Sequence, residues 1–266
     1  MKNEAVLTIP LSGKKQVIDA YDRVVVKMHL QKQQKNRSVF LICGTDPKVG
    51  ATSASMHLAA GLAKSGRKVL LLDADMRKAQ EKKAYGQESQ DTLVKYLTQD
   101  VSLEDVVYHT EIQGLSVIPG GVTPDPVELL CSQKMQILLD VSRKCFDFVI
   151  IDIPSVGAAA DANAVLGYVD QVVLVAAPER SYKKQILECY ETCQKYEADL
   201  LGVIVNRVDK YGYHDYMVNG NYYSKESEEE RLLYRIKARL GIGKEKTGKE
   251  KKGKKEKKSK KKNKES

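Results

Sequence analysis

Three short stretches of the chain carry residue types suited to phosphate chemistry. The first is "GTDPKVGATS" at 44–53, a turn between an apolar run and an Ala-rich stretch. Glycine lets backbone amides approach a phosphate closely, and the start of a following helix attracts anions. Thr52 stands where a hydroxyl would bind Mg²⁺, but Ala51 stands where such loops carry a lysine. Taken alone, this stretch fits a phosphate-binding loop and an ordinary strand–turn–helix connection equally well.

The other two stretches place carboxylates at the ends of apolar runs. "LLLDADMR" (70–77) contains Asp73 and Asp75, and "FVIIDIP" (148–154) contains Asp152. Buried carboxylates are costly unless they are used, and ligands bind at the carboxyl edge of a parallel sheet. We expect Asp73 and Asp75 to orient a hydroxyl or water and to hold Mg²⁺ through water, and Asp152 to hold Mg²⁺ as well. The alternative is that these aspartates cap helices or end strands, but the order of the three stretches favours nucleotide binding.

The rest of the pattern predicts the framework that positions these residues. Apolar runs alternate with helix-like segments, and most runs are continuously apolar, as is typical of strands buried on both faces. This predicts an α/β fold with a doubly wound, mostly parallel sheet of the P-loop NTPase type. The expected strands are 39–43, 68–75, 115–121, 146–154, 171–178 and 200–208, and the expected helices are 15–33, 52–65, 91–108, 126–143, 160–168 and 180–197.

The C-terminal part differs in composition from the rest of the 266 residues. Residues 244–266 hold 13 Lys and 4 Glu, which accounts for the whole formal charge of +9 and leaves 31 basic and 31 acidic residues elsewhere. We expect this tail to be disordered, because it has too few apolar residues to fold. Before it, 226–243 reads as an amphipathic helix with a capping box at Ser227 and Glu230. Five of the 14 tyrosines lie in a Gly- and Asn-rich stretch that we expect to be a loop: Tyr211, Tyr213, Tyr216, Tyr222 and Tyr223.

Cysteine usage and hydropathy bear on the compartment. The five cysteines are an odd, scattered set, and the first residues, "MKNEAVLTIP", lack the apolar region of a signal peptide. We therefore expect the protein to lie in a reducing cytoplasm. We expect its cysteines to be structural or incidental rather than catalytic or metal-binding. Apolar runs fall short of the roughly 20 residues of a membrane span, so any action at a membrane would require recruitment.

From about residue 15 to 223, the chain resembles the bacterial tyrosine kinases of capsule and exopolysaccharide synthesis. The motifs that carry the resemblance are "LLLDADMRK", "FVIIDIPS", "PDPVELLCSQKM" (124–135) and "LGVIVNRVDKYGY" leading into the tyrosines. The implied organisation is an N-terminal arm and helix (1–37), a P-loop kinase-like domain (38–210), the tyrosine cluster (211–225), the amphipathic helix (226–243) and the tail (244–266).

The resemblance also implies a site, cofactors and partners. ATP and Mg²⁺ are the implied cofactors, with Asp73, Asp75 and Asp152 catalytic and with Thr52, Asp75 and Asp152 on the metal. The implied nucleotide-binding residues are Gly44, Thr45, Asp46, Pro47, Lys48, Gly50, Ala51, Thr52, Ser53, Asn206 and Arg207, and the five clustered tyrosines are the implied phosphoacceptors. The implied partner is the cytoplasmic tail of a membrane-anchored polysaccharide co-polymerase that activates the kinase, and homo-oligomers are implied too.

Two departures from the family pattern leave alternatives open. Ala51 replaces the phosphate lysine, and "DAYDRVV" (19–25) has Asp22 and Val25 where the family has arginines used for ring assembly. Lys48 has a flexible stem and is a candidate substitute for the lysine, but it sits on the other limb of the loop. The chain is therefore interpreted as an ATP-dependent tyrosine autokinase or as a catalytically impaired pseudokinase and adaptor of the same complex. A partition-type ATPase on DNA is a third alternative, disfavoured by the tyrosine cluster. Residues 232–266 suit an anionic membrane surface at the inner face of the cell membrane, or act only as a solubilising tail.

Overall fold

The computed structural model describes residues 6–11, 15–77, 91–156, 160–178 and 180–208. Its strands are β1 (Val6–Leu7), β2 (Val39–Gly44), β3 (Val69–Asp73), β4 (Tyr108–Thr110), β5 (Leu115–Ile118), β6 (Phe148–Ile153), β7 (Gln171–Ala176) and β8 (Asp199–Val205). Within the described residues they form one eight-stranded sheet in the order β1-β4-β5-β3-β6-β2-β7-β8. All neighbouring pairs are parallel except β4 with β5. The expected mostly parallel α/β fold is confirmed.

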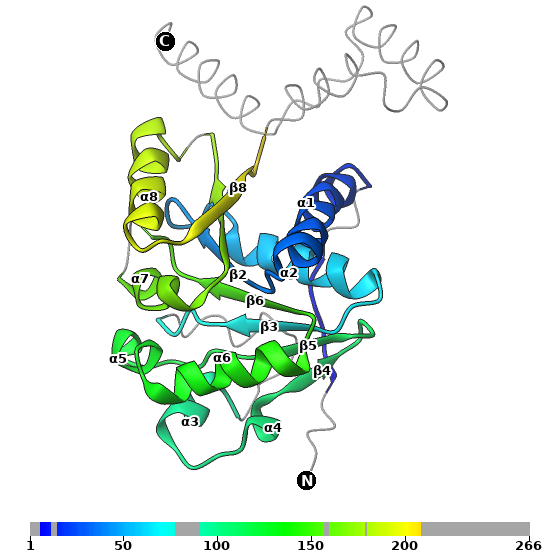
Figure 1. Cartoon of the computed structure of the whole chain (residues 1–266), viewed down its shortest axis with the longest axis vertical. Coiled ribbons are helices and arrows are strands. Elements are labelled where there is room, and N and C mark those ends of the chain that lie inside the picture. The colour runs from blue at the N-terminus through cyan, green and yellow to red at the C-terminus, as the bar shows by residue number, and fades with distance from the viewer. Residues whose placement is uncertain (1–5, 12–14, 78–90, 157–159, 179, 209–266) are drawn as a thin grey trace, which may run out of the picture. The chain divides into compact units, whose positions relative to one another are not determined.

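The helices connect these strands and cover both faces of the sheet (Figure 1). They are α1 (Lys15–Lys35), α2 (Ala51–Lys64), α3 (Leu93–Thr98), α4 (Leu103–Val106), α5 (Pro126–Leu130), α6 (Gln133–Cys145), α7 (Asp161–Val165) and α8 (Lys183–Lys195), with a 3₁₀ turn at Leu166–Tyr168. Helices α1 and α2 lie on one face, and α3 to α8 pack on the other.

The continuously apolar strands divide their side chains between two cores. On β2, Phe40 and Ile42 face α1 and α2, whereas Leu41 and Cys43 face the opposite layer. All four are completely buried, and alternation along a strand is the reason that both faces need apolar residues. This arrangement explains why the strand sequences lack a polar face.

The central strands bring the three candidate stretches to one edge. β2 lies between β6 and β7, and β3 lies beside β6. Because these strands are parallel, their carboxyl ends coincide, and the turn after β2, the aspartates after β3 and Asp152 on β6 meet there. The sheet therefore positions the site through topology alone.

The predicted helix at 91–108 was wrong. The structure has two short helices there, α3 and α4, followed by β4. The hydroxyl of Thr92 caps α3 by accepting a hydrogen bond from the N–H of Lys95, and Ser102 forms a capping box with Asp105 that starts α4. Local capping thus outweighed the continuous helical pattern. In the same way, Ser132 caps α6 and separates it from α5 within the predicted helix 126–143.

Candidate nucleotide site

The loop after β2 has a backbone that only a few residue types adopt. Gly50 has φ of 95° and immediately precedes α2. A Cβ atom on Gly50 would lie 2.2 Å from Nδ2 of Asn206, so glycine is required both by conformation and by space. Lys48 also has a positive φ, of 63°, and is exposed. The result is a tight turn that delivers the chain into the first turn of α2.

The first limb of this loop is joined to the first turn of α8. Oδ1 of Asp46 accepts a hydrogen bond of 2.8 Å from Nε2 of Gln185, and Oδ2 accepts one of 3.0 Å from the hydroxyl of Thr45. The hydroxyl of Thr45 also lies 2.7 Å from that of Ser181, which in turn accepts from the N–H of Ala177 at 3.2 Å. Side chains beyond β7 therefore hold the loop in place.

The second limb is held from the end of β8. Nδ2 of Asn206 donates to the carbonyl oxygen of Val49 at 2.8 Å, and Oδ1 of Asn206 accepts from the N–H of Arg207 at 2.8 Å. Asn206, one of the implied nucleotide-binding residues, is thus bonded to backbone at both ends of its amide, and it reaches the phosphate loop. Arg207 is exposed beside it.

The first turn of α2 contains Ala51 at the position where phosphate-binding loops carry a lysine. Ala51 is the first residue of the helix, Thr52 is half-buried, and Ser53 is exposed. Backbone amides at a helix start favour a phosphate, and Thr52 is the second residue of this helix. Ala51 supplies no charge, so a bound phosphate would have to be neutralised by the amides, by a bound cation or by Lys48.

The three candidate aspartates are buried at the carboxyl edge of the sheet. Asp73 and Asp152 stand directly opposite each other in the register of β3 and β6, and Asp73, Asp75 and Asp152 expose 4%, 5% and 1% of their surface. Oδ1 of Asp73 accepts from the N–H of Asp75 at 3.1 Å, which fixes the turn between them. The N–H of Ala74 donates to the carbonyl oxygen of Asp152 at 2.7 Å and extends the strand pairing.

Ser55 is a site residue that the sequence reasoning missed. Its hydroxyl, fully buried on α2, donates to Oδ1 of Asp152 at 2.9 Å and also lies 3.1 Å from the carbonyl oxygen of Ala51. The available signal was a small polar residue one turn beyond Ala51 on the face that packs on the sheet. Ser55 links the helix after the phosphate loop to the carboxylate on β6.

Asp161 was also missed, and it is completely buried at the start of α7. Arg77 holds it with two hydrogen bonds, from Nε to Oδ2 at 2.7 Å and from Nη2 to Oδ1 at 2.6 Å. These bonds raise the pKa of Arg77 above its ordinary value. The pair ties the segment after β3 to the segment after β6, and the candidate carboxylates lie at the ends of these two strands and directly after β3.

The donor set suits magnesium only if phosphate and water complete it. Within the described ranges, groups of three or more His, Cys, Asp or Glu side chains that could hold a metal by themselves are absent. Mg²⁺ commonly takes one or two carboxylates together with substrate phosphates and waters. Asp152, Asp75 and the hydroxyl of Thr52 provide such a partial set at the edge that the phosphate loop faces.

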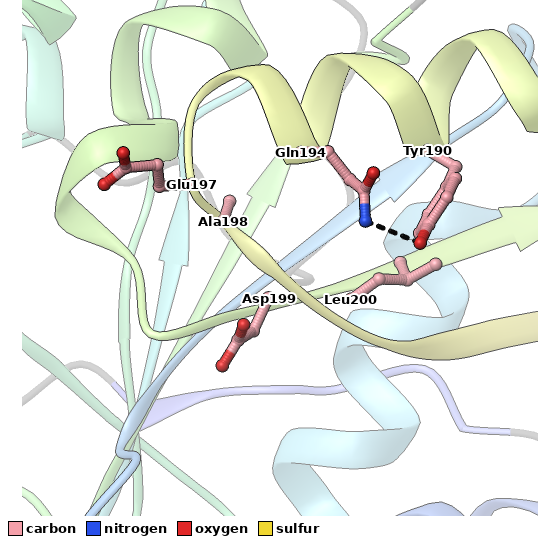
Figure 2. Close-up of a pocket in the computed structure, with 6 residues that line it drawn as sticks. All are labelled: Tyr190, Gln194, Glu197, Ala198, Asp199 and Leu200. Atoms are coloured by element: carbon pink, nitrogen blue, oxygen red, sulfur yellow. Dashed lines mark hydrogen bonds between the residues drawn. The ribbon is translucent and has the colours of Figure 1, made fainter.

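A separate surface hollow lies elsewhere on the molecule. Figure 2 shows it between the end of α8 and the beginning of β8, where Gln194 donates to the hydroxyl of Tyr190 at 2.6 Å. Its other lining residues are Glu197, Ala198, Asp199 and Leu200. This is the amino end of β8, so the hollow does not belong to the carboxyl-edge site.

Three of the cysteines are buried, and all five are free thiols. Burial raises the pKa of Cys43 well above its ordinary value and that of Cys189 to about 11. Protonated, buried thiols are poor nucleophiles and poor metal ligands. Cys43, Cys189 and Cys193 lie in the core layer shared by β2 and α8, which supports the structural role expected of them.

Some expectations concern other parts of the chain. Tyr211, Tyr213, Tyr216, Tyr222 and Tyr223, the helix 226–243 and the tail 244–266 lie outside the described residues. On α1, Val25 is buried and Asp22 is exposed at the positions where the family has arginines. Among the helices of the described ranges, a membrane-spanning candidate of sufficient length and apolarity is lacking.

A tight turn through Gly50 between a parallel strand and a helix, with buried aspartates on the neighbouring strands, defines an α/β protein of the P-loop class. Residues 42–201 match the family model described as "AAA domain". The chain belongs to the bacterial tyrosine-kinase family: it is 30% identical over 203 residues to the tyrosine-protein kinase CpsD of Streptococcus agalactiae, covering 74% of this chain and 86% of that protein.

Further relatives extend this comparison. The tyrosine-protein kinase ptk of Acinetobacter johnsonii is 36% identical over 180 residues, covering 67% of this chain and 24% of that protein. The chain spans about a quarter of the length of this and several other curated relatives.

Solved structures show the same fold. The kinase domain of the Escherichia coli tyrosine kinase ETK superposes with a TM-score of 0.69 at 28% identity, covering 77% of this chain and 91% of that domain. The septum-site-determining protein MinD of Pyrococcus horikoshii, solved with Mg-ADP, superposes with a TM-score of 0.56 at 25% identity. The match covers 67% of this chain and 76% of the MinD chain.

Proposed function

We propose that the protein is an ATP-dependent tyrosine autokinase-like protein that regulates capsular or exopolysaccharide synthesis and export. The observation that carries the proposal is the carboxyl edge, where the phosphate loop, Thr52 and the buried Asp73, Asp75 and Asp152 come together. Its relatives CpsD and ptk are named tyrosine-protein kinases, and MinD was solved with Mg-ADP. Together these support Mg-ATP as the nucleotide.

In the proposed reaction, a tyrosine hydroxyl attacks the γ-phosphorus of ATP, the bond to the β–γ bridging oxygen breaks, and ADP leaves. Asp73 would orient the tyrosine hydroxyl and accept its proton. Bound Mg²⁺ would neutralise charge on the phosphates, and Asp152, oriented by Ser55, would hold it with Asp75 and Thr52. The acceptors would be the tyrosines between 211 and 223.

One observation favours a second candidate function, a pseudokinase that binds nucleotide and serves as an adaptor of the same assembly. Ala51 removes a charge that stabilises the transferring phosphoryl group, and such electrostatic stabilisation commonly contributes more to catalysis than any other single effect. Lys48 is exposed on the opposite limb of the loop and has a flexible stem. Whether it reaches the phosphates decides between the two functions.

The deciding experiment compares the natural protein with Ala51→Lys and with Asp152→Asn as a negative control. Calorimetry measures Mg-ATP binding, and mass spectrometry measures tyrosine phosphorylation in the presence of the activating tail of the membrane partner. Tyrosine phosphorylation of the natural protein supports the autokinase function. Phosphorylation seen only in the Ala51→Lys variant supports the pseudokinase function. If neither protein binds Mg-ATP, both functions are wrong.

The location that fits this proposal is the inner face of the cell membrane. A membrane-anchored co-polymerase would recruit the chain, and residues 232–266 would add attraction to anionic lipid of up to about 1 kcal/mol per lysine. Salt-dependent sedimentation with anionic liposomes, with and without 244–266, tests the contribution of the tail. Equal sedimentation of both proteins would reduce the tail to a solubilising role.

A further inference from the structure

A carboxylate within a phosphate loop is unfavourable unless something neutralises or redirects it. Asp46 and Lys48 are the charged residues of the stretch 44–53, and the lysine position is Ala51. A polyanion entering this loop would therefore meet a negative charge without the usual lysine. The structure shows what engages that charge.

Asp46 is held by the first turn of α8. Gln185 is the third residue of this helix, and its Nε2 donates to Oδ1 of Asp46 at 2.8 Å. Its Oε1 accepts from the N–H of Tyr182 at 2.8 Å, so both ends of the Gln185 amide are fixed. The helix has 13 residues, and the start of such a helix carries partial positive charge that favours a carboxylate.

The same contact fixes the backbone of the loop. The hydroxyl of Thr45 bonds Asp46 on one side and lies 2.7 Å from Ser181 on the other, while the N–H of Thr45 donates to the carbonyl oxygen of Val175 at 2.9 Å. On the opposite limb, Asn206 holds Val49. Both limbs are therefore tied to segments that follow neighbouring strands, which is the arrangement expected of a loop that is preorganised before ligand binds.

We propose that Gln185 is a positioning residue of the phosphate loop, which draws the carboxylate of Asp46 onto α8 and holds the loop amides ready for phosphate in the absence of a lysine at position 51. This inference deepens the proposed function, because it rests on a nucleotide phosphate entering the loop. It assigns a role to the start of α8, which the sequence motifs did not single out.

Gln185→Ala tests the proposal, and Gln194→Ala is its matched control. Gln194 is on the same helix, and its amide bonds the hydroxyl of Tyr190 at the far end of α8. Two measurements are made on the full chain: affinity for Mg-ADP and Mg-ATP by calorimetry, and hydrogen exchange of the backbone amides of residues 45, 46 and 48–50 without nucleotide. We expect Gln185→Ala to weaken binding about tenfold, the value of one hydrogen bond to a charged group, and to speed loop exchange, whereas Gln194→Ala does neither.

Variants at Asp46 separate positioning from a merely structural role. Asp46→Asn keeps an oxygen for Gln185 and removes the charge, so its affinity should equal or exceed that of the natural protein. In an Asp46→Ala background, Gln185→Ala should change affinity less than about twofold, because the pair is already broken. A general destabilisation of α8 would instead weaken binding equally in both backgrounds and would overturn the proposal.

The two proposals fail in distinguishable ways. If the natural protein binds no nucleotide but Gln185→Ala speeds loop exchange, Gln185 still fixes the loop, but the proposed function falls and with it the role of the loop in holding phosphate. If the loop amides exchange at the same rate in Gln185→Ala as in the natural protein, the positioning role is overturned, whether or not the protein binds nucleotide. Should Gln185→Ala fail to fold, Gln185→Glu retains the size of the side chain and sets a carboxylate against Asp46. The same loosening and loss of affinity are then expected, and unchanged values would contradict the role.

Discussion

The hydroxyl of Ser55 on α2 donates a hydrogen bond of 2.9 Å to Oδ1 of Asp152 on β6. Ser55 is one turn beyond Ala51, so this bond joins the helix that follows the phosphate loop to a carboxylate at the end of a neighbouring strand. Both side chains are buried. The bond helps to fix the orientation of the Asp152 carboxylate, which is what a preorganised metal ligand needs.

Ser55→Ala is expected to destabilise the protein by about 1–3 kcal/mol, because a buried carboxylate loses a hydrogen bond from a neutral donor. It should also weaken Mg-nucleotide binding by roughly tenfold, within the range for groups that orient a metal ligand. Urea denaturation measures the first effect, and calorimetry at fixed free Mg²⁺ measures the second.

Ser142→Ala is the control for this prediction. Ser142 is likewise a buried serine on a helix, but its hydroxyl makes no hydrogen bond within the part of the chain that the structure describes. Its removal should be neutral or stabilising by up to about 1 kcal/mol. Equal losses of stability for both variants would show that the bond to Asp152 contributes nothing specific.

Much of the fold could be predicted from the sequence because the central strands are buried on both faces. A run such as 148–151 must be apolar throughout when helices cover both sides, and these residues begin β6. Short elements at the sheet edge were not predictable in this way. β1 has two residues and β4 three, and pairing rather than periodicity defines them.

The site could be predicted only where a motif puts a charge at the end of a strand. Asp73 and Asp152 follow apolar runs, so their place at the carboxyl edge follows from the parallel topology. Ser55, Asp161 and Gln185 lie within helices, and their roles arise from partners 97, 84 and 139 residues away in the chain. Such contacts depend on tertiary packing, which local sequence patterns do not report.

Gly50→Ala is expected to cost about 2–3 kcal/mol and to abolish nucleotide binding. The left-handed backbone costs an alanine about 1–2 kcal/mol, and the new Cβ, 2.2 Å from Nδ2 of Asn206, would force that side chain to release Val49. Thermal unfolding and calorimetry measure the two effects.

Gly66→Ala separates backbone strain from the clash. Gly66 follows the C-cap of α2 with a φ of 84°, and a Cβ there meets no atom of the described structure within 4 Å. We expect about 1–2 kcal/mol of destabilisation from strain and unchanged nucleotide binding. Loss of binding in Gly66→Ala would mean that global strain, rather than the loop, explains the effect of Gly50→Ala.

The ion pair of Arg77 with Asp161 should show strong coupling. Arg77→Met leaves a completely buried carboxylate without its cation, which costs about 2–4 kcal/mol after allowance for the partly exposed guanidinium. Adding Asp161→Ala to Arg77→Met should cost much less than Asp161→Ala alone. A double-mutant cycle by urea denaturation gives the coupling energy, expected to exceed about 1 kcal/mol.

The exposed pair of Lys184 with Glu188 provides the comparison for that cycle. Its atoms are 3.6 Å apart and both side chains are mostly in solvent, so coupling of at most about 0.5 kcal/mol is expected. If the two cycles give equal values, burial of Asp161 does not strengthen the pair, and the tie between the segments after β3 and β6 is weak.

Asp170 should make stability depend on acid pH. Burial alone would raise its pKa, but hydrogen bonds from Arg143 and from the backbone N–H groups of Ser38 and Val39 outweigh burial and lower the pKa. The folded pKa therefore lies below the unfolded value of about 3.9. The stabilisation is fully present above that unfolded value and is lost as pH falls through the folded pKa.

Asp170→Asn is accordingly expected to lower the free energy of unfolding by about 2 kcal/mol at pH 7 and by less at pH 2.5, since the stabilisation by the carboxylate declines as pH falls below the unfolded pKa. Denaturant titrations at both pH values measure the difference. Asp199→Asn is the control, because its pair with Arg37 is 37% and 50% exposed and should contribute under about 1 kcal/mol at either pH. If Asp170→Asn shows the same loss at pH 7 and pH 2.5, the role of Asp170 is steric rather than electrostatic.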